Sequence, residues 1–509
     1  MSTARAWAVA LTGVDGHLVE VEADLSNQTP EFKIIGLPDK SLGEAVQRVH
    51  NACKNSGMDL PRRRLTVNLS PASLPKHGSG FDLAIAVVAL AAGGALTLRS
   101  IAHTVYIGEL GLDGRLRPVP GVLPAVFAAA RAGFDRVVVP SANEEEARLV
   151  AGIDVRAATT LAEVAVWHGA DVEVPEVDPV GVRTEIPEPV QSLDLADVVG
   201  QEEAVHALIA AAAGGHHILL SGPPGAGKTM LARRLPGILP HLTDEEALEV
   251  ASIRSLSGQP VHRLDPVPPI EAPHHSASST ALVGGGSRMA RPGSIVRAHR
   301  GVLFLDEAGE FSRGALDALR QPLESGIIEI HRAGFHARFP ARFQLVMAMN
   351  PCPCGNYGVR GAECVCPSIA IRRYASRLSG PLRDRIDIEL HVSRVAASRA
   401  TAGERAEMTT AEARERVGRA RRRAAERLKG TPWARNAEVP GSWLRQPSQR
   451  VDAAARAPLD RALERGALTL RGYDRVLRLA WTMADLADRD RPGQEEIGHA
   501  LFLKRGVAS

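Results

Sequence analysis

The order of apolar and polar positions changes twice along the chain, and each part predicts a different architecture. In the first part, 1–174, Ala-rich helical stretches alternate with short apolar runs at 7–11, 65–69, 105–107 and 136–139. This alternation predicts an α/β domain. The longest apolar run, at 83–98, is shorter than the roughly 18 to 20 residues of a membrane span and is flanked by polar motifs, so it predicts a core helix.

The second part, 194–400, contains strongly apolar runs that are bounded by polar residues suited to chemistry. These runs lie at 218–220, 302–305, 344–349 and 386–390. Near-continuous apolar strands with helices between them predict a parallel sheet that is covered on both faces. The third part, 401–509, is rich in Arg, Ala and Glu at helical spacing and predicts an all-helical domain. The Pro- and acid-rich stretch 175–193 predicts a linker.

Composition narrows the class of protein. The 509 residues are 45% hydrophobic and 23% charged, as in soluble globular proteins of about three domains. Lys and Arg (61) exceed Asp and Glu (58) by only 3, so binding to nucleic acid would require local basic patches. Aromatic residues make up 4%, which argues against single-strand binding on aromatic platforms. The sequence has no membrane-span or signal-peptide pattern and predicts a cytoplasmic protein with no membrane partner.

A phosphate-binding loop follows the first apolar run of the second part. Residues 222–229 fit the pattern G-x-x-x-x-G-K-[ST] between a strand and a helix. The glycines allow backbone N–H groups to surround the β-phosphate of ATP at the positive end of the helix. Lys228 would bind the β- and γ-phosphates, and the Thr229 hydroxyl would bind Mg²⁺. The predicted nucleotide-binding residues are Gly222, Pro223, Pro224, Gly225, Ala226, Gly227, Lys228 and Thr229.

Polar residues that complete an ATP-hydrolysing site end the next two apolar runs. Asp306 follows the run 302–305, at the carboxyl end of a predicted strand, where its carboxylate can hold the water shell of Mg²⁺. The adjacent Glu307 can polarise the water that attacks the γ-phosphate. Asn350 ends the following run and is suited to position that water. Together with the phosphate loop, these residues predict hydrolysis of ATP with Mg²⁺.

These motifs resemble those of AAA+ ATPases, and longer segments resemble the YifB/ComM family of the magnesium-chelatase-like branch. The segments are ARPGSIVRAHRGVLFLDE, LDALRQPLESG, GIIEIHRAGFHARFPARFQLVMAMNP and SRLSGPLRDRIDIEL. The resemblance covers nearly the whole chain and implies an AAA+ core with a helical lid. It assigns Arg385 as the arginine finger that enters a neighbouring subunit's site; Arg383 stands where the family has an apolar residue and is a rival. It also assigns Arg471 as the sensor-2 arginine, which contacts the γ-phosphate from the lid.

The resemblance also implies an assembly and a function. A finger supplied by a neighbour requires a ring, and the family implies a homo-hexamer. The implied function is a motor that couples ATP hydrolysis to DNA translocation, hence branch migration or unwinding of branched or single-stranded DNA in natural transformation or repair. A chaperone-like motor that remodels a protein partner, as in magnesium chelatase, is the alternative. Basic residues of the family-like hairpin 326–342 and the loop 273–286 are candidate contacts to DNA phosphates. The candidates in the hairpin are His331, Arg332 and Arg338.

The first part resembles the proteolytic domain of Lon and the similar domain of the RadA branch-migration ATPase. The resemblance rests on LPKHGSGFDLAIAVVALAA and on IGELGLDGRLRPVPGVLPAVFAAARAGFDRVVVPSAN. Lon-type peptidases use a Ser–Lys dyad, but Gly80 and Leu123 stand at the dyad positions here, so we predict a proteolytically inactive domain. Lys76 is interpreted as an exposed loop charge; the alternative is a contact to phosphate or DNA.

Four of the five cysteines lie in a short segment, 352–366, directly after Asn350. Cys352, Cys354, Cys364 and Cys366 form the pattern C-x-C-x₉-C-x-C. Cysteines this close in a cytoplasmic chain favour Zn²⁺ over disulfides, and four thiolates would make the site structural. The alternative is a cysteine-bearing loop without metal. Cys53, in the first part, is interpreted as a small core residue.

Overall fold

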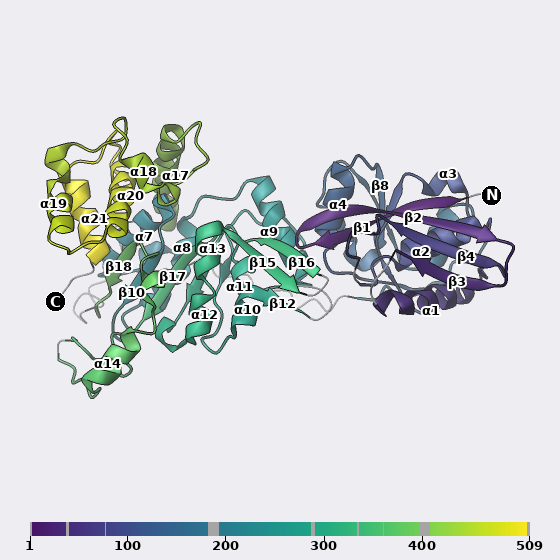
Figure 1. Cartoon of the computed structure of the whole chain (residues 1–509), viewed down its shortest axis with the longest axis horizontal. Helices are drawn as coiled ribbons and strands as arrows, with labels where there is room; N and C mark the ends of the chain where they lie inside the picture. The colour runs from purple at the N-terminus through teal and green to yellow at the C-terminus, as the bar shows by residue number, and fades with distance from the viewer. Residues whose placement is uncertain are drawn as a thin grey trace.

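The structure is a computed structural model that describes residues 3–36, 40–76, 78–181, 193–286, 291–332, 335–359, 361–395 and 408–505. These residues form an elongated molecule with three parts in chain order (Figure 1). The N-terminal domain occupies one end, a core built on a second sheet lies in the middle, and helices form the other end. The two termini therefore lie at opposite ends of the molecule.

A seven-stranded mixed sheet forms the N-terminal domain, in the order β3-β4-β2-β1-β5-β8-β9. Its strands are β1 (Ala4–Thr12), β2 (Asp15–Ser26), β3 (Glu31–Ile35), β4 (Arg64–Ser70), β5 (Thr104–Tyr106), β8 (Arg136–Pro140) and β9 (Asp154–Ala158). Helices include α1 (Lys40–Asn55), α2 (Asp82–Ala92), α4 (Val122–Arg131) and α6 (Leu161–Trp167). Helix α2 is buried from Asp82 to Ala91, which confirms a core helix in the first part of the predicted run 83–98; the helix ends at Ala92, before Gly93 and Gly94. Strands β2, β3 and β9 were not predicted, because half-exposed polar residues interrupt their apolar positions.

The core contains a five-stranded parallel sheet in the order β11-β14-β17-β10-β18. Its strands are β10 (Ile218–Ser221), β11 (Ile270–Glu271), β14 (Val302–Leu305), β17 (Gln344–Met349) and β18 (Ile388–His391). The four predicted apolar runs become β10, β14, β17 and β18, which confirms the parallel sheet; the two-residue β11 was not predicted. Ser221 lies opposite Met349 and His391, so the carboxyl ends of three strands meet at one edge.

Side chains of this sheet alternate between two apolar layers. Ile218, Leu220 and Phe304 belong to a cluster with α7 (Glu202–Gly214) and α8 (Lys228–Ile238). Leu219 and Leu303 belong to another cluster on the opposite face. That face carries short helices, including α10 (Ser279–Val283), α11 (Ser294–Arg297), α12 (Arg313–Asp317) and α13 (Arg320–Ser325), and a hairpin of β15 (Ile327–Arg332) and β16 (Phe335–Pro340). Burial of both faces explains why the strands are apolar throughout.

The N-terminal domain packs on the core through α4 and α9 (Asp244–Leu256). The backbone N–H of Gly121 donates to the Ser255 carbonyl at 3.1 Å, and a Cβ at position 121 would lie 3.0 Å from Leu256. Apolar residues of both parts, among them Leu123 and Ala251, form one buried cluster. The domain is therefore packed on the core as well as linked to it by the chain.

The C-terminal part is helical, as predicted. Its helices are α17 (Thr410–Arg427), α18 (Gly441–Leu444), α19 (Ala453–Glu464), α20 (Leu470–Leu486) and α21 (Gln494–Arg505). In the Arg-rich α17, Arg421 donates to the Ala212 carbonyl at 2.7 Å and Arg427 pairs with Asp485 at 2.5 Å, so these arginines are structural. Among the described residues, no helix combines the length and the apolar character that a membrane crossing requires.

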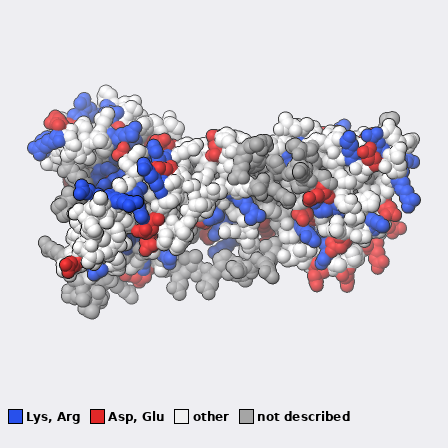
Figure 2. Space-filling model, turned by 60° about the horizontal axis from the view of Figure 1, so that its bottom comes forward, with Lys and Arg blue, Asp and Glu red and all other residues white. Residues whose placement is uncertain are grey.

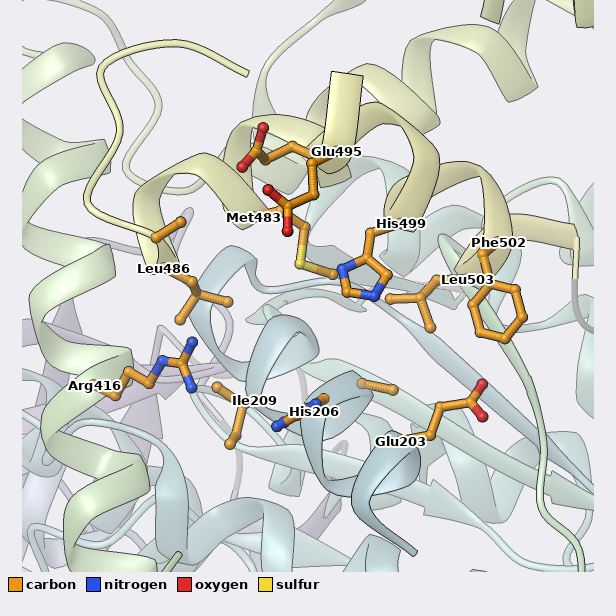
Figure 3. Close-up of a pocket in the computed structure, with 13 residues that line it drawn as sticks. Glu203, His206, Ile209, Arg416, Met483, Leu486, Glu495, His499, Phe502 and Leu503 are labelled. Atoms are coloured by element: carbon orange, nitrogen blue, oxygen red, sulfur yellow. The ribbon is translucent and has the colours of Figure 1, made fainter. Parts of the chain in front are cut away.

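A cavity of about 550 Å³ lies where α7, α17, α20 and α21 meet. His206 of α7 and His499 of α21 point toward it from opposite sides (Figure 3). Its lining contains no residue of the phosphate loop, so it is distinct from the predicted ATP site.

Candidate functional site

The phosphate loop connects β10 to α8, as its motif predicts. Gly225 and Gly227 have φ angles of +76° and +87°, a conformation that favours glycine and lets the backbone curl ahead of the helix. Lys228 opens α8, and its Nζ donates to the carbonyls of Gly222 at 2.7 Å and Pro223 at 2.9 Å. Burial lowers the pKa of Lys228, against the attraction of Asp306 and Glu307. The ammonium group is thus held inside the loop, next to two carboxylates.

Three strand ends bring the predicted catalytic side chains together. Thr229, at the start of α8, donates its hydroxyl to Asp306 at 2.7 Å, and Asp306 follows β14. Lys228 donates to Oδ1 of Asn350, which follows β17, at 3.1 Å. A hydroxyl and a carboxylate at this spacing are hard oxygen ligands, which fit Mg²⁺ bound together with a substrate phosphate.

Glu307 stands beside this group in an unusual backbone conformation. Its φ of +52° lies in the left-handed region, which is uncommon for a residue other than glycine and marks a locally constrained turn. His275 lies 3.1 Å from the Glu307 carboxylate, measured from Nδ1 to Oε2. His275 comes from the loop after β11, which the sequence suggested only as a DNA contact. Its contact with Glu307 was not predicted, because no local pattern reports a contact between segments more than thirty residues apart.

Arg385 lies at the opposite end of the sheet from the phosphate loop. The backbone N–H of Asp387, just before β18, donates to the His217 carbonyl, just before β10, at 3.1 Å. Parallel strands place this end one strand length away from Ser221, where the phosphate loop begins. Arg385 pairs with Glu324 and donates to the Pro381 carbonyl at 2.5 Å. The chain therefore does not bring Arg385 to its own phosphate loop.

The two other candidate arginines lie at the same end as Arg385. Arg383 pairs with Glu389 at 2.6 Å, whereas Arg471, at the start of α20, is 79% exposed and lies 3.8 Å from Asp384. The resemblance led us to expect Arg471 over the γ-phosphate. In this structure Arg471 stands beside the segment that carries Arg385, because α20 is attached to the amino ends of β10 and β18.

A buried polar network makes this attachment. Asp387 pairs with Arg475 of α20 and with His216 at 3.2 Å, and His216 hydrogen-bonds Thr482 of α20 at 2.7 Å. Burial alone would raise the pKa of Asp387, but the positive charge of Arg475 and the hydrogen bond from His216 hold it well below its usual value. The ionised Asp387 thus fixes α20 against the core.

Comparison with known proteins agrees with this architecture. Residues 194–400 match the family described as magnesium chelatase, subunit ChlI; residues 21–143 match subunit ChlI of Mg-chelatase, and residues 407–504 match its C-terminal part. The competence protein ComM of Haemophilus influenzae is 42% identical over 100% of this chain and 98% of its own. An uncharacterized protein of Mycobacterium tuberculosis H37Rv is 48% identical over 99% of both chains. The uncharacterized protein YifB of Escherichia coli K12 is 38% identical over 97% of this chain and 96% of its own.

The chain belongs to the ComM/YifB family. This magnesium-chelatase-like family is part of the AAA+ ATPases, and membership implies ATP and Mg²⁺ as its nucleotide and metal. Lys228, Thr229 and Asp306 are the residues of this chain whose contacts fit that pair.

The cysteines of this ComM/YifB family member form a compact cluster. The Sγ atoms of Cys352, Cys354, Cys364 and Cys366 all lie within 4.8 Å of one another. Hydrogen bonds, first that from the backbone of Asn356, lower the pKa of Cys354 to about 6. Cys53 is buried in the N-terminal domain, where burial raises its pKa to about 12 and suits a core thiol.

The candidate DNA contacts lie on the hairpin β15–β16. His331 and His336 stack with ring centroids 4.4 Å apart, and both are exposed, as is Arg338. The side chain of Arg332 lies outside the described residues. The backbone carbonyl of Arg338 closely approaches Gly13, in the turn between β1 and β2, so the N-terminal domain covers part of this hairpin.

One sequence interpretation of the N-terminal domain is wrong. Lys76 is buried, not an exposed loop charge, and its Nζ donates to the carbonyls of Pro71 at 2.5 Å and Leu74 at 3.2 Å. Backbone carbonyls gathered around an ammonium group offset the cost of its burial, which the sequence pattern does not reveal. Leu123, at the lysine position of a Lon-type dyad, is buried in the interface with α9.

Proposed function

We propose that the chain is the subunit of a hexameric ring that couples ATP hydrolysis to DNA translocation, and that it drives branch migration or unwinding of recombination intermediates. The observation that carries this proposal is the separation of two groups of residues, the proposed half-sites of ATP hydrolysis. Lys228 lies at the carboxyl ends of the parallel strands, and Arg385 lies at their amino ends. One chain holds both halves but cannot join them, whereas a head-to-tail ring joins each phosphate loop to the next chain's arginines.

In the proposed reaction, the residues of the phosphate-loop end act within one subunit. Lys228 would bind the β- and γ-phosphates, and Thr229 and Asp306 would hold Mg²⁺, which would neutralise phosphate charge. Glu307 accepts a proton as water attacks the γ-phosphorus, and the bond to the β-phosphate oxygen breaks to release ADP and phosphate. Asn350 orients that water.

The arginines of the neighbouring subunit act on the transferring phosphoryl group. Arg385 and Arg471 both lie at the amino ends of the core strands, so both would reach the neighbouring subunit's ATP site together. Forked guanidinium donors suit charge that is spread over three oxygens. This arrangement moves the sensor-2 role of Arg471 from its own lid to the neighbouring subunit.

Several observations support DNA as the cargo. Along the hairpin β15–β16, side chains alternate between exposed and buried: His331, His336 and Arg338 are exposed, and Ile330 is buried. Figure 2 shows a group of Lys and Arg side chains on the half of the molecule that carries the core and the C-terminal helices, with Asp and Glu side chains beside it. A ring multiplies such contacts around its pore, where phosphates bind without regard to sequence. The H. influenzae relative carries the name competence protein.

A protein-remodelling motor is the second candidate, because the matching family is described as magnesium chelatase. The two candidates differ in what stimulates hydrolysis. We expect branched or single-stranded DNA to raise the ATPase rate several-fold and the effect to fall with added salt. Arg338→Ala should lower this stimulation, and Arg313→Ala, an exposed arginine on α12 with 80% side-chain exposure, should leave it unchanged. An ATPase that no DNA structure stimulates would favour the protein partner.

A further inference from the structure

The four clustered cysteines have the spacing of ligands to a single metal ion. The Sγ of Cys352 lies 3.4 Å from that of Cys354 and 3.7 Å from that of Cys364, and the Cys354–Cys364 distance is 3.7 Å. Four sulfurs at 2.3 Å from a tetrahedral Zn²⁺ lie about 3.8 Å apart. The observed distances exceed the S–S bond of about 2 Å in a disulfide. They leave no room for an iron–sulfur cluster, which places iron and sulfide between its ligands.

The backbone around the cysteines supports this ligand arrangement. The N–H of Tyr357 donates to Cys352 Sγ at 3.3 Å, and the N–H of Gly355 donates to the Cys352 carbonyl at 3.0 Å. The Asn356 side chain donates to the Glu363 carbonyl at 3.2 Å, which ties the two C-x-C segments together. Such contacts orient metal ligands and stabilise thiolates. The loop is thus arranged as a closed, four-sulfur site with no position for a substrate.

The same loop packs on the phosphate loop at one point and directly follows a residue of the ATP site in the chain. Gly355 has a φ of +81° and packs on the phosphate loop, where a Cβ would lie 2.7 Å from Pro224 Cγ. Cys352 is fully buried and lies two residues after Asn350, whose side chain accepts from Lys228 at 3.1 Å. The cysteine loop therefore packs against the backbone of the phosphate loop, and through Asn350 it is connected to the hydrogen bond of Lys228.

We propose that these four cysteines bind one Zn²⁺ and that the metal-bound loop sets the position of the phosphate loop, so that ATP affinity depends on the metal. The metal is structural, because four thiolates leave no vacancy for catalysis. Without it the segment 352–366 loses its cross-link, and Gly355 no longer supports Pro224. The proposed coupling between zinc binding and ATP affinity rests on the proposed function of the ATP site. The proposed zinc site itself does not depend on that function.

The metal itself is tested by elemental analysis of full-length protein purified without chelator. We expect about one zinc per chain in the wild type and in Cys53→Ala, which removes the buried cysteine of the N-terminal domain, and none in Cys354→Ser/Cys364→Ser. Zinc well below one per chain in the wild type, or another metal in its place, would overturn the site. If the double variant does not fold, zinc removal from folded wild-type protein with a thiol-competing chelator gives the same comparison.

The coupling is tested by a pair of glycine variants that keep all four cysteines. Gly355→Ala adds a methyl group against Pro224, whereas Gly358→Ala adds one at a φ of +74° with nothing within 4 Å. Both variants carry the same left-handed strain. We expect both to retain zinc, and we expect Gly355→Ala to weaken binding of a fluorescent ATP analogue about tenfold, or about 1.4 kcal/mol, relative to Gly358→Ala.

Removal of zinc should weaken ATP binding at least as much as Gly355→Ala, in excess Mg²⁺ and with unchanged circular dichroism. Equal ATP affinity in wild type, Gly355→Ala and zinc-free protein would overturn the coupling even with zinc bound. A zinc-loaded wild type that binds no ATP would overturn the proposed function and the coupling together and would leave the metal site standing.

Discussion

The two ends of the central sheet differ in how they hold their functional residues. At the carboxyl ends, side chains bond one another: Thr229 donates to Asp306, and Lys228 donates to Asn350. At the amino ends, Arg385 and Arg471 pair with carboxylates of their own chain, Glu324 and Asp384. The candidate ATP-binding residues at the first end contact one another within one chain. The second end carries guanidinium groups, which attract phosphate, on the opposite side of the same chain. The comparison supports the proposal that each subunit carries two complementary half-sites.

The energetics of the two ends also differ. The bonds at the carboxyl end join polar groups that could equally bind phosphate oxygens or Mg²⁺. At the amino end Asp387 is buried, with 2% exposure, and pairs with Arg475, whose side chain is 16% exposed; this pair fixes the helix that carries Arg471. The contacts at the first end thus involve groups that can bind a ligand, whereas the Asp387–Arg475 pair at the second end is structural.

The largest effect should come from Lys228→Ala at the carboxyl end. This change removes the point charge that the phosphate loop offers to the β- and γ-phosphates, and we expect no measurable ATP binding or hydrolysis. Glu307→Gln is the matched variant: it should bind ATP like the wild type and stop before hydrolysis, because positioning survives and proton acceptance does not. Binding of a fluorescent ATP analogue and release of phosphate separate the two. Normal turnover in Glu307→Gln would remove Glu307 as the base.

At the amino end, Arg385→Ala should cut hydrolysis by about 10³ and leave ATP binding by a single subunit nearly intact. The phosphate loop of the Arg385→Ala chain is unchanged, so this chain still binds ATP. The loss of hydrolysis occurs at the ATP site of the neighbouring subunit. Steady-state phosphate release and equilibrium ATP binding measure the two quantities.

A mixing experiment decides whether Arg385 acts in trans. Arg385→Ala and Glu307→Gln subunits, each inactive alone, should regain part of the activity when mixed, because some interfaces join an intact Arg385 to an intact Glu307. Arg383→Ala serves as the control and should have a smaller effect, since Arg383 pairs with Glu389 in its own chain. A mixture as inactive as its components would contradict the division into half-sites.

A third prediction concerns the buried support of the amino end. Arg475→Ala leaves Asp387 buried without its main partner, and we expect a loss of about 3 kcal/mol in the free energy of unfolding. Arg471→Ala removes an exposed pair and should cost less than about 1 kcal/mol. Urea titration followed by circular dichroism compares the two variants. Equal losses would mean that the buried pair does not anchor α20.

The depressed pKa of Asp387 gives this stabilisation a defined pH dependence. An unfolded Asp titrates near about 3.9, so the contribution is complete above that pH and is lost as the pH falls toward the lower folded pKa. Asp387→Asn should therefore be less stable than the wild type at pH 7, and the difference should shrink below about pH 4. A difference that stays constant with pH would contradict an ionised Asp387.

The sequence predicted the carboxyl end more fully than the amino end, for a physical reason. The phosphate loop and Asp306 are set by local signals: a glycine-rich turn, an apolar strand and the acid that ends it. Four predicted runs accordingly coincide with β10, β14, β17 and β18. The position of Arg471 depends instead on a bond between Arg475 and Asp387, 88 residues apart in the chain. Buried Lys76 escaped prediction similarly, because one of its acceptors is the Gly36 carbonyl, 40 residues away.

The smallest expected effect concerns His275, which joins the loop 273–286, a candidate DNA contact, to Glu307, the proposed catalytic base. The Glu307–His275 contact of 3.1 Å is partly exposed, with side-chain exposures of 54% and 37%, so it is worth at most about 1 kcal/mol, or about fivefold in rate. Because the bond competes for the carboxylate that must accept the proton from water, we expect His275→Ala to raise the ATPase rate without DNA. DNA that draws the loop away would relieve the same restraint, so the variant should respond less to DNA than the wild type does.

His274→Ala is the matched control, since His274 bonds Ser276 at 2.8 Å and not Glu307. The measurement is the ratio of ATPase rates with and without branched DNA. If the ratio falls equally in His275→Ala and His274→Ala, the loop 273–286 acts only by binding DNA. The contact between His275 and Glu307 would then not restrain hydrolysis.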